Sequence, residues 1–124
     1  MGITGLGGVF FKCNNPVKLM EWYHEKLGLT SDKYGRTFLW DDAEGSSVWA
    51  PFPKDTTYFG PSDKAFMINF RVNDLVNYLE EIRDKDVEII GEMKEEVYGK
   101  FAHILDLEGN KIELWEPIDS ALKK

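Results

Sequence analysis

The stretch DLEGNKIELW, residues 106–115, decides the fold because it predicts a β-hairpin of defined register. Leu107-Glu108-Gly109 suits a three-residue turn with its glycine in the left-handed conformation. Asp106 then pairs with Asn110, and pairing continues outward one residue at a time on each strand. This register places Glu113 opposite His103 on the same face of the sheet. A carboxylate and an imidazole are therefore expected side by side.

The residues before this hairpin predict a strand, a helix and a second strand. Residues 66–72 and 87–90 have the β-branched and aromatic composition of short strands. Between them, Asp74 is a suitable N-cap for a helix. The apolar residues of that helix recur at helical spacing, at Leu75, Tyr78, Leu79 and Ile82. Residues 66–115 therefore predict a βαβββ unit.

The first half of the chain repeats this order. Residues 3–12 and the segments 36–40 and 47–50 predict strands, and Asn15 with Pro16 predicts the start of a helix. Matched positions in the two halves keep one offset at the start of the units and another at their closing strands, as a true internal repeat requires. We expect an α+β fold in which two βαβββ-type units form a curved sheet around a central cleft.

Length and composition favour one domain and exclude several partners. A hydrophobic content of 43% is enough for one core, and a length of 124 residues is too short for two ordinary domains. We expect a single domain over residues 1–124, with unit one at about 1–53, a connector at about 54–64 and unit two at about 65–118.

The net charge and the apolar runs set the expected location and partners. A net charge of −7 would repel nucleic acid. No apolar run reaches the roughly 20 residues that cross a membrane, and no secretory leader opens the sequence. We therefore expect a cytoplasmic protein that binds neither nucleic acid nor membrane. Cys13, the single cysteine, has no intrachain partner for a disulfide.

Two motifs resemble those of the vicinal oxygen chelate superfamily, which includes glyoxalases, bleomycin-resistance proteins and dioxygenases. One is the D-x-x-G-N-x-x-E-L hairpin of residues 106–114, and the other is Asn14-Asn15-Pro16 followed by Trp22-Tyr23 and Leu27-Gly28. The resemblance runs nearly end to end. It implies a divalent metal bound by one ligand on the first strand and one on the last strand of each unit.

The four implied metal positions hold a poor ligand set. They read Gly8, Ser47, Met67 and Glu113, of which only Glu113 is a good ligand for a hard metal ion. A stable zinc, iron or manganese site normally uses at least three good protein ligands. A divalent metal is therefore not expected as a cofactor. Reactions that depend on such a metal are not expected either.

The expected site lies on the sheet face that carries Glu113 and His103. These two are the candidate catalytic residues, as a general base with its orienting partner, although pairing alone also explains them. The resemblance to fosfomycin-resistance proteins implies that the position of His103 contacts substrate. His24 lies among charged helix residues and is expected in solvent. The candidate ligand-binding residues are Phe10, Ser47, Trp49, Met67, Asn69, Arg71 and Trp115.

Three functions remain open at this point. The first is a protein that binds a small, partly apolar molecule in the cleft without chemistry, as the resemblance to bleomycin-resistance proteins implies. The second is a glyoxalase-type lyase or related enzyme with a weak metal or a metal-free acid–base site at His103 and Glu113. The third is an assembly subunit. We also expect a homodimer, because a two-unit sheet leaves open edges.

Overall fold

The computed structural model describes residues 2, 6, 8–40 and 45–122. Helix α1 continues directly into a single π-helical turn, and a short 3₁₀ helix follows the last strand. In chain order the elements are α1 (Pro16–Trp22), η1 (Tyr23–Leu27), β1 (Ile68–Arg71), α2 (Leu75–Arg83), β2 (Ile89–Glu96), β3 (Gly99–Leu105), β4 (Lys111–Pro117) and η2 (Asp119–Leu122).

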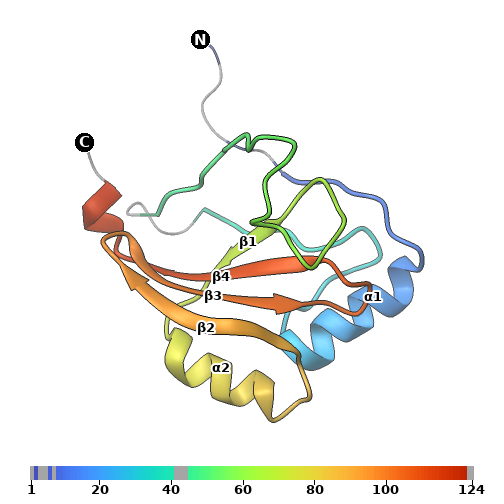
Figure 1. The fold of residues 1–124 in the computed structure, drawn as a ribbon. Coiled ribbons are helices and arrows are strands. Elements are labelled where there is room, and N and C mark those ends of the chain that lie inside the picture. Colours follow the sequence, from blue (N-terminus) through green and yellow to red (C-terminus); the bar gives the residue numbers. More distant parts are fainter. Residues whose placement is uncertain (1, 3–5, 7, 41–44, 123–124) are drawn as a thin grey trace.

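The second unit has the predicted order of elements, but β2 runs from Ile89 to Glu96 where the sequence predicted a strand over 87–90 and a solvated loop over 92–96. Its strands make one curved sheet in the order β1-β4-β3-β2, with β1 parallel to β4 and the other neighbours antiparallel (Figure 1). The predicted α+β class is therefore confirmed. The N-caps are also as predicted, since Asn15 accepts a hydrogen bond from the amide of Lys18 and Asp74 accepts one from the amide of Asn77.

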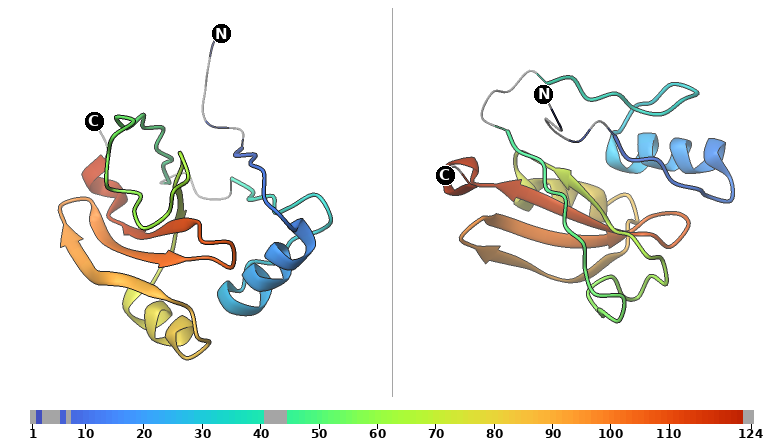
Figure 2. Two further views of the ribbon diagram at one scale, coloured as in Figure 1. Left: turned by 45° about the vertical axis from the view of Figure 1, so that its right-hand side comes forward. Right: turned by 90° about the horizontal axis from the view of Figure 1, so that it is seen from above.

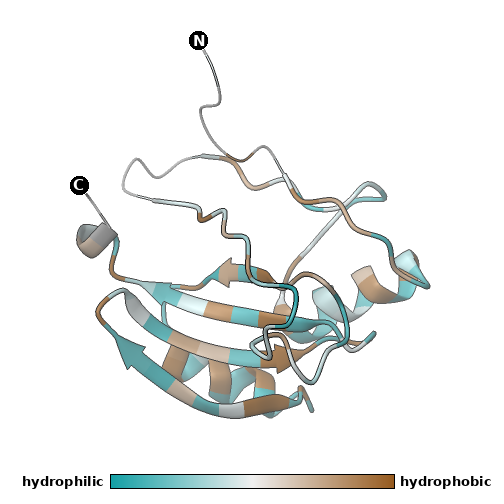
Figure 3. Cartoon of the chain, turned by 45° about the horizontal axis from the view of Figure 1, so that its top comes forward, coloured by the Kyte–Doolittle hydropathy of each residue, from teal (hydrophilic) through white to brown (hydrophobic). Residues whose placement is uncertain are grey.

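The core lies between the sheet and the two helices. Figure 1 shows α2 lying across one face of the sheet, with α1 beside it. Hydrophilic and hydrophobic residues alternate along the strands (Figure 3), so each strand turns one set of side chains toward the helices. The core residues with the least exposed surface are Leu75, Ile82, Ile104, Ile112 and Leu114. In the described part of the chain, the opposite face is not covered by a helix.

The 106–115 hairpin has the predicted register. His103 pairs with Glu113, and Leu105 pairs with Lys111 next to the turn. Gly109 adopts the left-handed conformation that the turn requires, with φ 77°. The carboxylate of Asp106 accepts hydrogen bonds from the amides of Glu108 and Asn110 and from the side-chain amide of Asn110, at 2.8–2.9 Å. The Asp and Asn of the motif thus fix the turn.

The same turn joins the two halves of the chain. The hydroxyl of Tyr23 donates to Asp106 Oδ2 at 2.8 Å, in a buried position. The carboxylate of Glu108 accepts hydrogen bonds from the backbone amides of Asn14 and Asn15, at 2.7 and 2.9 Å. These amides precede α1, so the hairpin turn holds the start of that helix. Both motifs that carry the family resemblance therefore meet at one junction.

The first unit differs from the prediction. Its helix forms, but the described residues of the expected strands 3–12, 36–40 and 47–50 form no strand and run as irregular segments on the side of the sheet opposite α2 (Figure 2). The apolar side chains Phe10, Trp40 and Trp49 are 79–97% exposed. A strand needs a hydrogen-bonding neighbour and a covered face, and the structure supplies neither for these segments. For the residues of the first unit that the structure describes, the strand prediction is therefore wrong.

Two parts of the first-unit prediction lie outside the described residues. These are positions 3–5 and 7 of the first expected strand and positions 41–44 between the second and third.

Candidate functional site

Glu113 is the centre of a polar cluster on the sheet face opposite the helices. It lies in the middle of β4 and is 8% exposed. Its Oε2 accepts hydrogen bonds from His103 Nε2 at 2.8 Å and from the hydroxyl of Tyr58 at 2.5 Å. Its Oε1 accepts one from Asn69 Nδ2 at 2.8 Å. Both oxygens of this carboxylate are thus engaged.

Strand pairing explains why three of these residues meet. Asn69 on β1 pairs with Glu113 in the parallel ladder, and His103 on β3 pairs with it in the antiparallel ladder. Directly paired residues point to the same side of a sheet, so three polar side chains from three strands converge. The predicted pairing of Glu113 with His103 is confirmed by the hydrogen bond between them.

The hydrogen bonds keep Glu113 ionised. Burial alone raises the pKa of this carboxyl, but hydrogen bonds from His103, Tyr58 and Asn69 outweigh it and lower the pKa below its ordinary value. An ionised carboxylate only accepts, so His103 Nε2 carries the proton in this pair. The cluster stabilises the fold at neutral pH, and this contribution is lost as the pH falls below about 4.3, the ordinary pKa of glutamate, and through the folded-state pKa.

Tyr58 and Lys111 belong to the site although the sequence analysis did not select them. Tyr58 comes from the connector, and burial and the neighbouring Glu113 raise its pKa, so its hydroxyl stays a donor. The ammonium of Lys111 donates to the backbone carbonyl oxygen of Tyr58 at 2.5 Å. Burial lowers the pKa of Lys111, which is 7% exposed. Lys111 lies two residues before Glu113 in β4, so both side chains are on the same face of the sheet. This spacing was the sequence signal that could have placed Lys111 in the site.

A stacked aromatic pair, with Trp115 buried at 5% exposure, adjoins the polar cluster. The indole of Trp115 stacks on the ring of Phe101 with their centroids 5.9 Å apart and an interplanar angle of 8°. The guanidinium of Arg71 lies over the same indole, 5.7 Å from its centroid. Arg71 also forms a two-point ion pair with Asp119, at 2.8 and 2.9 Å. The structure therefore brings two further predicted residues, Arg71 and Trp115, to this face.

The remaining predicted residues are not brought to Glu113 by any described contact. Phe10 and Trp49 are 97% and 80% exposed, and Ser47 is exposed as well. Met67 is partly buried, directly before β1. Their contact with a ligand stays a prediction.

The four implied metal positions do not fit a divalent metal. Gly8 has no side chain, Ser47 is exposed, and both oxygens of Glu113 accept hydrogen bonds. Within residues 2, 6, 8–40 and 45–122, no three His, Cys, Asp or Glu side chains are grouped as a metal site requires. No chemical step is therefore assigned to a metal.

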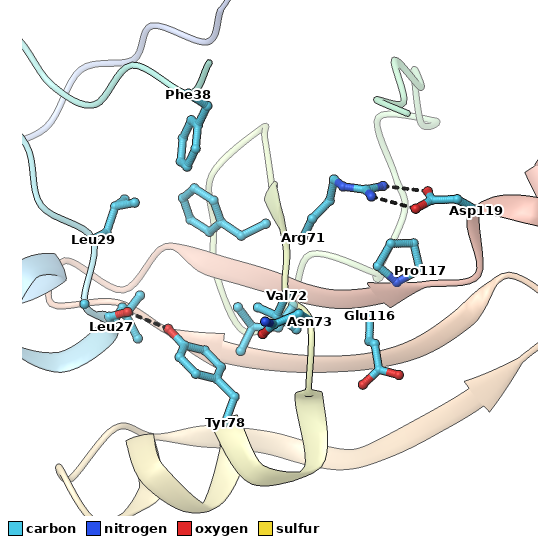
Figure 4. A pocket seen from close by; sticks show the side chains of 13 residues that line it. Leu27, Leu29, Phe38, Arg71, Val72, Asn73, Tyr78, Glu116, Pro117 and Asp119 are labelled. Atoms are coloured by element: carbon cyan, nitrogen blue, oxygen red, sulfur yellow. Dashed lines mark hydrogen bonds and ion pairs between the residues drawn. The ribbon is translucent and has the colours of Figure 1, made fainter. Parts of the chain in front are cut away.

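A separate cavity of about 660 Å³ opens beside β1 (Figure 4). Of the predicted site residues only Arg71 lines it, and Arg71 is bound to Asp119 there. The hydroxyl of Tyr78 points across it and donates to the backbone carbonyl oxygen of Leu27 at 2.8 Å. Burial raises the pKa of Tyr78 to about 12. Arg71 and Tyr78 therefore both have hydrogen-bond partners within the protein.

The hairpin, the sheet and the polar cluster together define a glyoxalase-like α+β domain. The model of the Glyoxalase/Bleomycin resistance protein/Dioxygenase superfamily matches residues 6–114, so the chain belongs to this superfamily. No curated protein matches the sequence significantly. Among the described residues, no helix is long and apolar enough to span a membrane.

Solved structures that are similar to this chain have low sequence identity to it. TnmS3, an antibiotic binding protein from Streptomyces sp. CB03234, is 18% identical over 94% of this chain and 98% of its own, with a TM-score of 0.59. The integron cassette protein VCH_CASS1 from the mobile metagenome of V. cholerae is 17% identical over 79% of this chain and 83% of its own. Its TM-score of 0.43 is too low to support a functional comparison.

Proposed function

We propose that this protein binds a small, partly apolar molecule on the open face of its sheet. The observation that carries the proposal is the buried carboxylate of Glu113, held by three polar side chains beside the stacked rings of Phe101 and Trp115. Apolar walls with a few convergent polar groups are the usual composition of a small-molecule site.

The cluster is not part of the hydrophobic core. The hydrophobic core lies on the other face, between the sheet and the helices. Burying a carboxylate costs several kcal/mol, on the order of the net stability of a small domain, unless hydrogen bonds compensate it. Three hydrogen bonds compensate Glu113, and a convergent polar group of this kind beside apolar side chains is typical of a ligand site. The description of TnmS3 as an antibiotic binding protein supports a binding role for this fold.

A panel of fused aromatic compounds with hydroxyl or amide groups tests this proposal. We expect some of these compounds to raise the melting temperature of the wild-type protein. Calorimetry should show that they bind the Glu113→Gln variant at least about tenfold more weakly than wild type, a loss of about 1.4 kcal/mol in binding free energy. Tyr78→Phe is the matched control, because it removes a hydroxyl from the cavity beside β1. If Tyr78→Phe weakens binding and Glu113→Gln leaves it unchanged, the ligand binds in that cavity and not at Glu113.

The hydrogen bond between His103 and Glu113 favours a second candidate function, a metal-free acid–base site of a glyoxalase-type lyase or related enzyme. In this role Glu113 accepts a proton and His103 orients it. The proton transfer requires that Glu113 stays ionised, and this depends on its partners.

Replacing His103 by phenylalanine should raise the pKa of Glu113, because a donor to its ionised form is lost while burial is kept. The measurement is a nuclear magnetic resonance titration of the Glu113 carboxyl carbon. His24→Phe is the control, since His24 contacts Thr30 and not Glu113. An unchanged titration in His103→Phe would remove the acid–base site.

We also propose that the protein is a homodimer. β1 lies at an edge of the sheet, and the segments around Phe10, Trp40 and Trp49 expose large apolar side chains. A second copy would cover both. Sedimentation velocity at about 100 μM, well above ordinary dimer dissociation constants, should give twice the 14.3 kDa of one chain. A single species of one chain's mass would contradict the dimer.

A further inference from the structure

We propose that the side chain of Tyr58 occupies a phenol subsite of the binding face, and that the hydroxyaryl group of a ligand takes its place. The inference rests on the proposed function and names the class of ligand. The three donors to Glu113 come from different kinds of segment. Asn69 and His103 are fixed on strands, but Tyr58 comes from residues 51–67, which form only turns and bends. Tyr58 is therefore the donor that can leave.

The hydroxyl of Tyr58 occupies the position of a ligand donor. It donates to Glu113 Oε2, the oxygen that also accepts from His103 Nε2. When the tyrosine leaves, this oxygen keeps one donor and regains capacity for another. A phenolic hydroxyl from a ligand satisfies it in the same geometry, so the exchange leaves Glu113 Oε2 fully paired.

The ring of Tyr58 is surrounded by groups that recognise an aromatic ring. The imidazole of His103 meets it edge-on, with centroids 5.4 Å apart and an interplanar angle of 89°. The ammonium of Lys111 lies 5.1 Å from its centroid. Phe52 stacks on it at 5.7 Å and 13°. His103 and Lys111 are on strands and would meet the ring of a bound phenol in the same way.

Displacing Tyr58 uncovers no residue of the hydrophobic core and releases a second polar group. The side chain is 39% exposed, so it is not part of the packed core. Its departure also frees the ammonium of Lys111, which donates to the backbone carbonyl oxygen of Tyr58. Lys111 then needs a new acceptor. The geometry therefore fits a planar hydroxyaryl compound that carries a carbonyl or another acceptor near the ring.

The direct test restores the missing side chain with its free analogue. We expect p-cresol to bind Tyr58→Ala at least about tenfold more tightly than wild type, measured by calorimetry. 4-Methylanisole has the same ring and no donor, and should show no such gain. The gain should vanish in Tyr58→Ala with Glu113→Gln. Tyr34→Ala is the matched control, because Tyr34 is 86% exposed and distant in sequence from the connector.

A measurement on the wild type covers the case in which Tyr58→Ala fails to fold. Saturation with 2-naphthol should abolish the nuclear Overhauser effects between the rings of Tyr58 and His103. If 2-naphthol does not bind up to its solubility limit, or binds with these effects intact, the subsite is rejected. Equal binding of p-cresol and 4-methylanisole to folded Tyr58→Ala also rejects it.

The two proposals fail in different ways. If compounds of the panel bind in a way that depends on Glu113 but leave the contact between Tyr58 and His103 intact, the proposed function is kept and the phenol subsite is rejected. If neither p-cresol nor any compound of the panel depends on Glu113, the proposed function is rejected and the phenol subsite with it.

Discussion

Replacing Asp106 by alanine should lower the free energy of unfolding by about 3–5 kcal/mol, since a buried hydrogen-bond network loses its acceptor. The carboxylate is 6% exposed and accepts from Tyr23, Glu108 and twice from Asn110. Without it, the buried hydroxyl of Tyr23 and the side-chain amide of Asn110 have no acceptor there. Each such unpaired group costs about 1–3 kcal/mol.

Equilibrium unfolding in urea, followed by circular dichroism, measures this loss. Asp55→Ala is the control, because Asp55 is exposed in the connector and should change stability by less than about 0.5 kcal/mol. A loss below about 1 kcal/mol for Asp106→Ala would show that the turn does not depend on this carboxylate.

Gly99→Ala should destabilise the sheet by about 3 kcal/mol or more through a backbone collision and a strained conformation. Gly99 begins β3 with φ 133°, a conformation that other residues rarely adopt. A Cβ built there would overlap the carbonyl oxygen of Glu116 and lie 3.0 Å from the indole nitrogen of Trp115. Strand β4 would have to move away from β3.

Gly91→Ala separates the two causes. Gly91 also has a positive φ, 66°, but a Cβ there meets nothing within 4 Å. It should therefore lose only the conformational term, about 1–2 kcal/mol, in the same urea experiment. Equal losses for the two variants would mean that the contact with β4 contributes nothing.

The sequence predicted the parts of the fold that depend on near neighbours. The register of the 106–115 hairpin followed from its turn and from alternation, because a short turn leaves one pairing. The pairing of His103 with Glu113 came with it. The N-caps at Asn15 and Asp74 are likewise local, since each contacts an amide three residues away.

The rest depended on contacts that the sequence does not encode locally. Residues 36–40 and 47–50 have the composition of strands, but a strand exists only where another backbone pairs with it. Tyr58 was missed for a related reason. It lies in a connector without helical or strand periodicity, so no spacing rule predicts that its hydroxyl reaches Glu113, 55 residues away in sequence.

The strand order has a consequence for the time course of folding on the ribosome. β4 lies between β1 and β3, yet it follows both in sequence. A growing chain therefore carries β1 without its hydrogen-bonding neighbour until residues 111–117 emerge. The backbone amides before α1 also lack their acceptor during synthesis, because they donate to Glu108, which is 94 residues beyond Asn14. The nascent first half must stay soluble with its core residues Leu19 and Tyr23 uncovered, and it is during this interval that we expect chaperones to bind.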